Sequence, residues 1–221
     1  ICIARCNEGK IKILKKYLFP HSLGVFYESF TQLIGFKNYG DEYKMMGLSS
    51  YGKPKYYDLI LNKVFKKSKK IELNLKYFNH TDKNFTYKFR GQPNQNDLYN
   101  LELEKLLNIK DLKIENISDT QKDIAASAQK IFEKKLLDIC ADSKKKNISN
   151  NLVYAGGCAL NSLANKKIFE SNLFENIYIP YAPGDGGGAL GSALCVQKKK
   201  DDKVKLSNLN NPYIGTSYKD D

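Results

Sequence analysis

The sequence has no tryptophan, two histidines and only two arginines, Arg5 and Arg90. Nearly all of its positive charge therefore comes from lysine, although the formal net charge is +12. Guanidinium groups make the commonest specific contacts to bases and bidentate contacts to phosphates, whereas a lysine offers a single point charge. The charge balance thus gives little support to a nucleic-acid-binding protein, and solvated lysine runs at helix ends and in loops explain it.

Cysteine and histidine are also too sparse or too scattered for two common kinds of site. The five cysteines are odd in number, and Cys2 and Cys6 are not spaced as a C-x-x-C pair. This pattern predicts reduced, mostly buried thiols rather than a disulfide framework. A zinc site lacks a ligand set, because His21 and His80 are the only histidines.

No apolar run approaches the length of a membrane span, and no signal-peptide pattern occurs, so we expect a cytoplasmic protein without membrane contact. A length of 221 residues suits one large domain or two small ones. The sequence begins at Ile1 inside a predicted strand and ends in a polar tail. We therefore expect it to be a fragment of a longer protein.

The C-terminal part of the chain alternates short apolar runs, glycine turns and helical patterns. Leu152–Ala155 predicts a strand that stops at Gly156–Gly157, and a helix is predicted from Cys158. Ile177–Ile179 predicts a second strand, with another helix after Asp185. Two strands that are each followed by a helix predict a parallel pair with right-handed crossovers. Both glycine turns then fall at the carboxyl ends of the strands, where ligands bind in such sheets.

The chemistry of these turns leaves two interpretations open. Glycine lacks a Cβ atom, so a phosphate or an adenine can approach the main chain at Gly156 and Gly157. A carboxylate at Asp185 would repel that phosphate unless a metal ion lay between them. Alternatively, Asp185 caps the following helix and the glycines allow close packing. Neither the G-x-G-x-x-G nor the P-loop pattern is present.

Before these turns the pattern predicts a strand hairpin and two well-marked helices. The strands would meet at a tight turn at Glu8–Gly9. Ser22 would cap a helix that ends at Gly35, and Ser118 would cap a long helix over Asp119–Ala141. His21, beside the first cap, is expected to be a hydrogen-bonded structural residue or to line the substrate side.

Residues 55–117 read as a possible inserted α+β segment. Helices are predicted over Tyr56–Phe65 and Leu98–Leu107. Ile71–Leu75 and Phe85–Phe89 look like strands of a hairpin, with a loop after them. The segment contains no motif that points to chemistry.

The glycine-rich stretch Gly40–Pro54 combines acids, lysines and tyrosines. Lys44 is a point cation that can meet a phosphate or a carbonyl oxygen. From spacing alone, however, Lys44 and Glu42 are interpreted as a surface pair that contributes little.

Taken together, these stretches resemble the Kae-type lobe of the O-carbamoyltransferases of the NodU/CmcH family. The order, spacing and residue types agree in four places, whereas the middle of the chain agrees only loosely. The matching motifs are HSLGVFYESFTQLIGF at His21–Phe36, GDEYKMMGLSSYGKP at Gly40–Pro54, YAGGCALNSLAN at Tyr154–Asn165, and IPYAPGDGGGALGSAL at Ile179–Leu194, with PYIGTSY in the tail.

The resemblance implies an α/β fold of the actin/hexokinase-like (ASKHA) type. Residues 1–200 would be the second lobe, with a mixed sheet that joins the antiparallel hairpin to the parallel βα units and carries helices on both faces. Residues 201–221 would be a linker toward a YrdC-like domain. In the family's full enzymes, that domain makes carbamoyl adenylate from carbamoyl phosphate and ATP, and the Kae-like region transfers the carbamoyl group to a hydroxyl of a small, often sugar-containing acceptor.

The resemblance also assigns site residues and reverses the surface-pair interpretation of Lys44. Asp185 would be a ligand of a divalent metal, typically iron, in the longer protein. The family's other metal ligands, an H-x-x-x-H pair and a further acid, lie in a region that precedes this sequence, so the isolated chain is expected to be inactive and to bind metal weakly or not at all. The implied nucleotide-binding residues are Glu42, Lys44, Gly52, Gly156, Gly157 and Asn161.

Two alternatives remain beside the carbamoyltransferase. A relative that transfers threonylcarbamoyl to tRNA is disfavoured, because the Gly40–Pro54 motif reads EYK without an acid directly before the lysine and without a following PGG. The other is a non-catalytic nucleotide-binding or interaction module.

Overall fold

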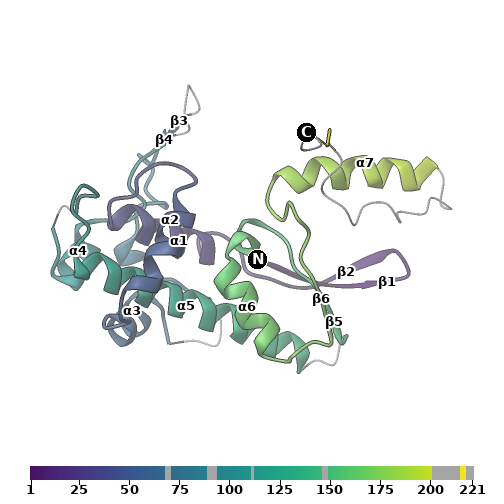
Figure 1. The fold of residues 1–221 in the computed structure, drawn as a ribbon, viewed down its shortest axis with the longest axis horizontal. Helices are drawn as coiled ribbons and strands as arrows, with labels where there is room; N and C mark the ends of the chain where they lie inside the picture. Colours follow the sequence, from purple (N-terminus) through teal and green to yellow (C-terminus); the bar gives the residue numbers. More distant parts are fainter. Residues whose placement is uncertain (68–70, 89–93, 111, 146–148, 201–214, 218–221) are drawn as a thin grey trace.

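The computed structural model describes residues 1–67, 71–88, 94–110, 112–145, 149–200 and 215–217 (Figure 1). The strands are β1 Cys2–Asn7, β2 Lys10–Lys16, β3 Tyr87–Lys88, β4 Asn94–Gln95, β5 Asn151–Val153 and β6 Asn176–Tyr178. The helices are α1 Leu23–Leu33, α2 Glu42–Leu48, α3 Tyr57–Val64, α4 Leu101–Leu107, α5 Asp119–Lys144, α6 Ser162–Glu170 and α7 Gly186–Lys200. Short 3₁₀ turns are η1 Ser49–Tyr51, η2 Leu75–Tyr77 and η3 Gly157–Leu160.

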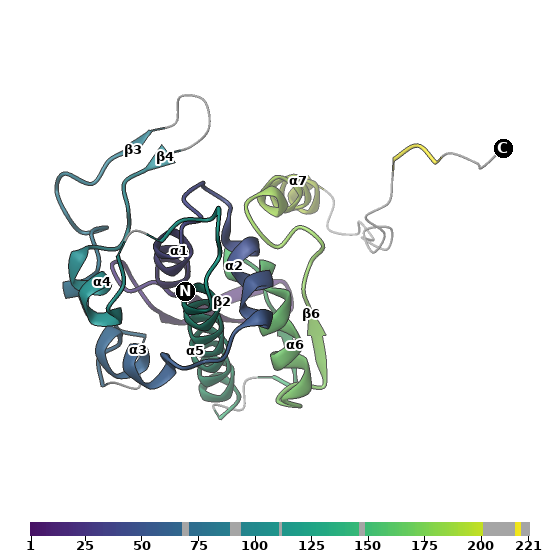
Figure 2. The same cartoon turned by 60° about the vertical axis from the view of Figure 1, so that its left-hand side comes forward.

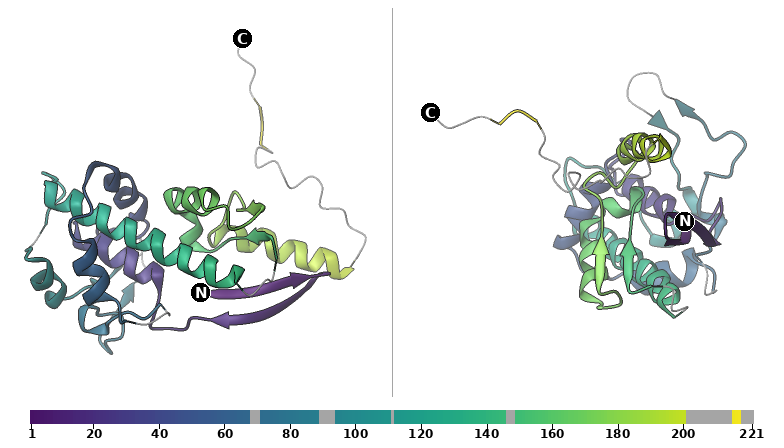
Figure 3. Two further views of the ribbon diagram at one scale, coloured as in Figure 1. Left: turned by 90° about the horizontal axis from the view of Figure 1, so that it is seen from below. Right: turned by 90° about the vertical axis from the view of Figure 1, so that its right-hand side faces the viewer.

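Helix α5 is the element on which the helical part of the molecule is built (Figures 1 and 3). Its start is fixed by the predicted cap: the Gln121 N–H donates to Ser118 Oγ, and Gln121 Oε1 accepts in return from the Ser118 N–H at 2.8 Å. The predicted apolar stripe is buried, and α1, α2, α3 and α6 pack on the helix. The stripe consists of Ile124, Ala128, Ile131, Phe132, Leu136 and Ile139.

Helix α1 supplies the aromatic part of the core. Ser22 caps it by accepting from the Val25 N–H, as predicted, and Gly35 follows its end at φ +100°. Phe26 and Phe30 are fully buried, because helical spacing places them on one face, where Phe26 packs against Phe30 and Phe65. His21 is structural: its Nδ1 accepts from the Leu73 N–H at 3.2 Å.

The two predicted strand pairs are confirmed. β1 and β2 are antiparallel and meet at Glu8–Gly9, both with positive φ, and β5 pairs with β6 in parallel, with Leu152 opposite Ile177. The chain is therefore an α/β protein, but the single mixed sheet was a wrong prediction for the described residues, whose strands form separate two-stranded sheets (Figure 3). A strand pattern fixes local pairing, whereas the joining of pairs depends on which other segment lies at their edges.

The inserted segment differs from its predicted pairing. The hairpin joins Tyr87–Lys88 to Asn94–Gln95 and projects from the helical part (Figures 1 and 2). The predicted strand Ile71–Leu75 instead forms one isolated bridge, Leu73 to Phe65, before η2. Asn74 is the reason, because its side chain accepts from the Lys76 N–H and starts a turn. The predicted strand end at Phe89 lies outside the described residues, as does all but residues 215–217 of the expected linker 201–221.

The prediction that the cysteine thiols are mostly buried was wrong. All five cysteines are free, but Cys2, Cys6 and Cys195 are exposed, and only Cys140 is buried, with Cys158 half-buried. The exposed thiols lie on the thinly covered β1–β2 hairpin and on α7, which buries no side chain. Burial raises the pKa of the Cys140 and Cys158 thiols to about 11. In the described part of the chain, no helix is both long enough and apolar enough to cross a bilayer.

The segment that follows α2 docks on α5 through a close main-chain approach. A Cβ atom at Gly52 would lie 2.0 Å from the Lys122 carbonyl oxygen, so only glycine fits there. Beside it, Asp123 Oδ1 accepts from the Lys53 N–H at 2.7 Å, and Asp123 Oδ2 pairs with Lys55 Nζ at 2.6 Å. These hydrogen bonds hold the pKa of Asp123 below its ordinary value, because they favour the carboxylate.

Gly52→Ala is therefore expected to lower the free energy of unfolding by about 2–4 kcal/mol, since either α5 or the docked segment must move. Gly47→Ala is the matched control. A Cβ atom at Gly47 meets no atom within 4 Å, and alanine favours a helix by about 0.5–1 kcal/mol. Urea unfolding of both variants tests this expectation, and equal stabilities would show that the close approach does not constrain the fold.

Candidate glycine-turn site

The two predicted glycine turns lie together. The Gly156 N–H donates to the Pro183 carbonyl oxygen at 2.7 Å, which joins the turn after β5 to the turn after β6. Gly184 also lies close to η3, since a Cβ atom built at this position would be 3.5 Å from Leu160 Cδ1. The convergence follows from the parallel pairing of β5 and β6, whose carboxyl ends meet at one edge.

The first turn presents bare main chain to open space. Gly156 has φ +100°, a conformation that favours glycine, and a Cβ atom at Gly156 or Gly157 would meet nothing within 4 Å. Both residues are exposed. Within the described ranges, the N–H groups of Gly157 and Cys158, which open η3, have no acceptor. Unsatisfied N–H groups at a turn start suit an anionic oxygen.

The second turn contributes a tight bend and one acid. A Cβ atom at Gly187 would lie 2.1 Å from the Ala182 carbonyl oxygen, so this glycine serves close packing. The Asp185 carbonyl oxygen accepts from the Gly188 N–H at 2.9 Å. The Asp185 side chain is exposed and makes no hydrogen bond or ion pair with other described residues, so its carboxylate does not cap α7.

Asn161, predicted to hold the nucleotide, turns its side chain inward. It is 7 % exposed, and its Oδ1 caps α6 by accepting from the Ala164 N–H at 2.9 Å. Its amide also exchanges two hydrogen bonds with Gln129 of α5, at 2.9 and 3.0 Å. Gln129 Oε1 accepts from the Tyr27 hydroxyl at 2.7 Å, so α1, α5 and the start of α6 share one buried network. Asn161 therefore helps to position the first glycine turn through buried hydrogen bonds to α5 and α6.

Lys44 and Glu42 both lie on α2, but they do not form the pair that spacing suggested. Lys44 Nζ instead contacts Asp41 Oδ1 at 2.7 Å, and this hydrogen bond raises the pKa of Lys44. Asp41 is 6 % exposed and also accepts from the Asn38 N–H, so it is a fixed anchor. Among the described residues, neither Lys44 nor Glu42 makes a hydrogen bond or ion pair with a glycine turn.

Helix α2 nevertheless runs beside the start of α6 (Figure 2). Ser162 Oγ lies 3.6 Å from Met46 Sδ, which places the middle of the Gly40–Pro54 motif beside the start of α6, shortly after the first glycine turn. Gly52, in contrast, faces the α5 main chain, and its absent side chain serves docking. The structure thus brings the glycine turns together, places α2 beside them, and gives Gly52 and Asn161 packing and positioning contacts.

Glu28 is a functional candidate that sequence reasoning missed. It lies half-buried on α1, where Gln95 of the inserted hairpin donates a hydrogen bond to its carboxylate. Burial, together with the nearby charge of Glu42, raises the pKa of Glu28 to about 7, against a smaller lowering by Gln95. Glu28 is the only formally charged residue between His21 and Phe36. A single acid in an otherwise uncharged helix pattern is the sequence feature that could have indicated it. A carboxyl group with such a pKa can accept a proton near neutral pH.

A metal site is not completed by the described residues. Within the ranges that the structure covers, no group of three histidine, cysteine, aspartate or glutamate side chains is arranged to hold a metal ion. Asp185 alone contributes one exposed carboxylate, which is fewer ligands than divalent metal sites use.

Comparison with known proteins points to one family. Residues 4–194 match the family described as "Carbamoyltransferase N-terminus". An uncharacterized protein of Synechocystis is 40 % identical over 186 residues, covering 80 % of this chain and 28 % of that protein. Nodulation protein NolO of Bradyrhizobium diazoefficiens is 27 % identical over 202 residues, covering 88 % of this chain and 32 % of that protein.

Nodulation protein U of Sinorhizobium fredii is 33 % identical over a shorter stretch of 81 residues, which covers 35 % of this chain and 14 % of that protein. The chain therefore spans a third or less of the length of these three relatives.

The raised pKa of Glu28 predicts that Glu28→Gln increases the free energy of unfolding by an amount that depends on pH. The glutamine keeps a hydrogen-bond acceptor for Gln95. The folded pKa of about 7 lies above the ordinary value of 4.5, so burial of the charge costs stability as pH rises from 4.5 to 7. Removing the charge should stabilise the fold by about 1–2 kcal/mol at pH 8 and by little at pH 4. Urea unfolding across this range measures it.

Glu115→Gln, at an exposed position, is the matched control and should show no such pH-dependent gain. A gain from Glu28→Gln that does not change with pH would contradict the assigned pKa.

Proposed function

Since this chain belongs to the carbamoyltransferase N-terminus family, we propose that it is part of a cytoplasmic enzyme that transfers a carbamoyl group from carbamoyl adenylate to a hydroxyl of a small, sugar-containing acceptor. Carbamoyl phosphate and ATP are the proposed sources of the adenylate. An N-terminal lobe and a YrdC-like domain, both outside this chain, would complete the enzyme, and the chain alone would be inactive.

One observation carries the proposal: the hydrogen bond from the Gly156 N–H to the Pro183 carbonyl oxygen joins two glycine turns at the ends of parallel strands. Such an edge is where α/β proteins bind nucleotides. The open space over Gly156 and Gly157 leaves room for a phosphate and a flat base close to the main chain. The free N–H groups of Gly157 and Cys158 would donate to the phosphate oxygens.

The same groups would assist the chemical step. Carbamoyl adenylate is a mixed anhydride: the acceptor oxygen bonds to the carbamoyl carbon, and the bond from that carbon to the AMP phosphate oxygen breaks. The hydroxyl proton passes to a base that is not assigned, and AMP leaves with the electron pair. Main-chain N–H groups near the leaving phosphate would stabilise its growing charge.

Lys44 and Glu42 would face the ribose and phosphate side of the nucleotide. Support comes from the position of α2 beside the start of α6, where Met46 meets Ser162. Asp41 holds Lys44 at one place on this helix while keeping it protonated, so the cation is preorganised as a point charge.

We propose that Asp185 is one ligand of a divalent metal, typically iron, in the longer protein. Because the described residues supply a single carboxylate there, they do not fit a metal by themselves. The steps above therefore use only the main chain and side chains of this chain.

Gly157→Arg tests the site in the longer native protein by calorimetry with AMP. The arginine side chain would occupy the open space, so AMP affinity is expected to fall at least about 10-fold. The fold should be little affected, because no atom lies within 4 Å of a Cβ at this position.

Gly157→Ala is the matched control, since it adds only a methyl group and should retain more AMP binding than the arginine variant. Absence of AMP binding by the unaltered longer protein, or equal binding by the arginine variant, would refute the nucleotide site.

A further inference from the structure

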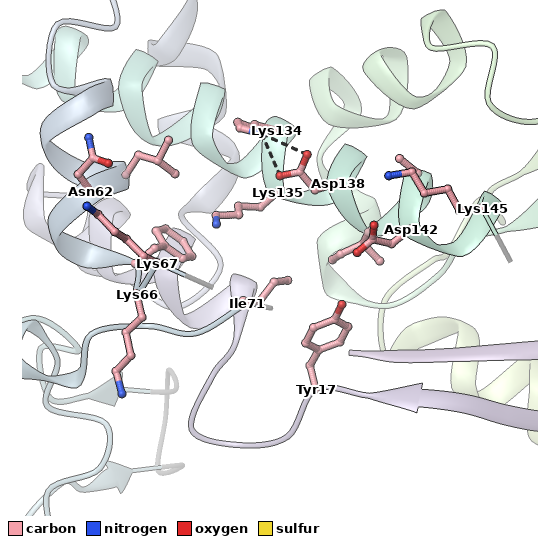
Figure 4. A pocket seen from close by; sticks show the side chains of 14 residues that line it. Tyr17, Asn62, Lys66, Lys67, Ile71, Lys134, Lys135, Asp138, Asp142 and Lys145 are labelled. Carbon is pink, nitrogen blue, oxygen red and sulfur yellow. Dashed lines mark hydrogen bonds and ion pairs between the residues drawn. The ribbon is translucent and has the colours of Figure 1, made fainter. Parts of the chain in front are cut away.

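A lysine-lined pocket lies apart from the glycine turns. It has a volume of about 460 Å³ and opens between the end of α3, the second half of α5 and Tyr17, which follows β2 (Figure 4). None of its lining residues belongs to the glycine turns or to α2. Its volume falls in the range of small-molecule pockets, which is about 300–1,000 Å³.

The pocket concentrates positive charge beyond the average of the chain. Five of its fourteen lining residues are lysines, whereas 36 of all 221 residues are lysine or arginine. Among the described lining residues the acids are Asp138 and Asp142, and Lys134 pairs with Asp138 at 2.9 Å. The other four lysines have no carboxylate partner among the described residues: Lys66, Lys67, Lys135 and Lys145.

Lys135 is the most constrained of these cations. Its Nζ lies 4.7 Å from the centroid of the Phe65 ring, and Phe65 is 2 % exposed. Burial lowers the pKa of Lys135, because its charge is partly desolvated; Asp138 acts against this shift and Lys134 adds to it. A bound anion would restore the stabilisation that Lys135 loses on burial.

The floor of the pocket is apolar. Figure 4 shows Lys135 of α5 facing the segment after α3, which carries Lys66 and Lys67 with their side chains turned outward. Ile71 and Tyr17 border the space on its other side. Phe65, Ile71 and Ile139 are buried lining residues. A ligand suited to this pocket therefore combines a strong anion with an apolar or aromatic body.

We propose that this pocket binds a phosphorylated small molecule, with its phosphate among the lysines and its organic body against the Phe65 and Ile71 floor. A nucleic-acid strand fits less well, because no arginine is among the described lining residues, and arginine makes the bidentate phosphate contacts. The site is separate from the carbamoyl adenylate site, and its failure would leave the proposed function unaffected.

Phenyl phosphate is the probe, with inorganic phosphate as the comparison, at 150 mM salt to suppress nonspecific attraction. Phenyl phosphate should bind saturably to the 221-residue chain and more tightly than inorganic phosphate, because the ring covers the apolar floor. In heteronuclear NMR, amide shifts should concentrate near Lys66, Lys135 and Lys145 and leave Gly157 unchanged. Shifts confined to Gly157, or no saturable binding, would overturn the proposal.

Lys135→Gln should weaken phenyl phosphate binding at least 5-fold. Lys12→Gln, a matched charge change on the exposed face of β2, should not. If Lys135→Gln fails to fold, Lys67→Gln at an exposed position replaces it and should weaken binding at least 2-fold. Equal losses in the pocket and Lys12 variants would mean nonspecific attraction. A different result would assign the pocket to nucleic acid. The unaltered chain would then bind a short oligonucleotide but not phenyl phosphate, and Lys135→Gln would lose the oligonucleotide binding.

Discussion

The hydrogen bond between the Gly156 N–H and the Pro183 carbonyl oxygen is the constraint on which the candidate site depends. β5 and β6 are three residues long and pair only with each other among the described strands, so they hold the turns at their ends weakly. The bond fixes the separation of the two turns directly. Glycine at position 156 permits it, because φ +100° turns the N–H toward the second turn without strain.

Helix α5 supports the same site through hydrogen bonds made by its polar side chains. Near its start, Asp123 accepts a hydrogen bond from the segment that follows α2. Farther along the same helix, Gln129 holds Asn161 at the start of α6. Both sets of residues that the resemblance assigns to the nucleotide are thus positioned from one rigid helix. Buried polar groups of this kind are costly unless satisfied, and here their hydrogen bonds lie between 2.7 and 3.0 Å.

Local chemistry explains what the sequence predicted well. The caps at Ser22 and Ser118 and the turn at Glu8–Gly9 depend on nearby residues alone, and all three formed as expected. The convergence of the glycine turns was also predictable, because two βα units allow one right-handed arrangement. The packing contact of Gly52 and the buried hydrogen bonds of Asn161 were not predictable, because each depends on a partner 32 or more positions away in the chain. The partners are Lys122 for Gly52 and Gln129 for Asn161.

The remaining differences have the same origin. The mixed sheet and the pairing of the inserted hairpin depend on which edges meet, and a strand pattern does not specify an edge. The mostly buried thiols were inferred from residue type, whereas the β1–β2 hairpin and α7 leave theirs exposed. Glu28 became a candidate only when tertiary structure placed Glu42 and Gln95 beside it. Predictions therefore held within an element and between the two consecutive βα units, and they failed where a segment farther along the chain decided the outcome.

The central claim is that the two turns act as one ligand site, and amide hydrogen exchange on the longer native protein tests it most directly. On addition of AMP, exchange should slow together at residues 156–158 and at 185–188, because a shared ligand covers both turns. Slowing at neither stretch, or at one stretch with the other unchanged, would contradict the account.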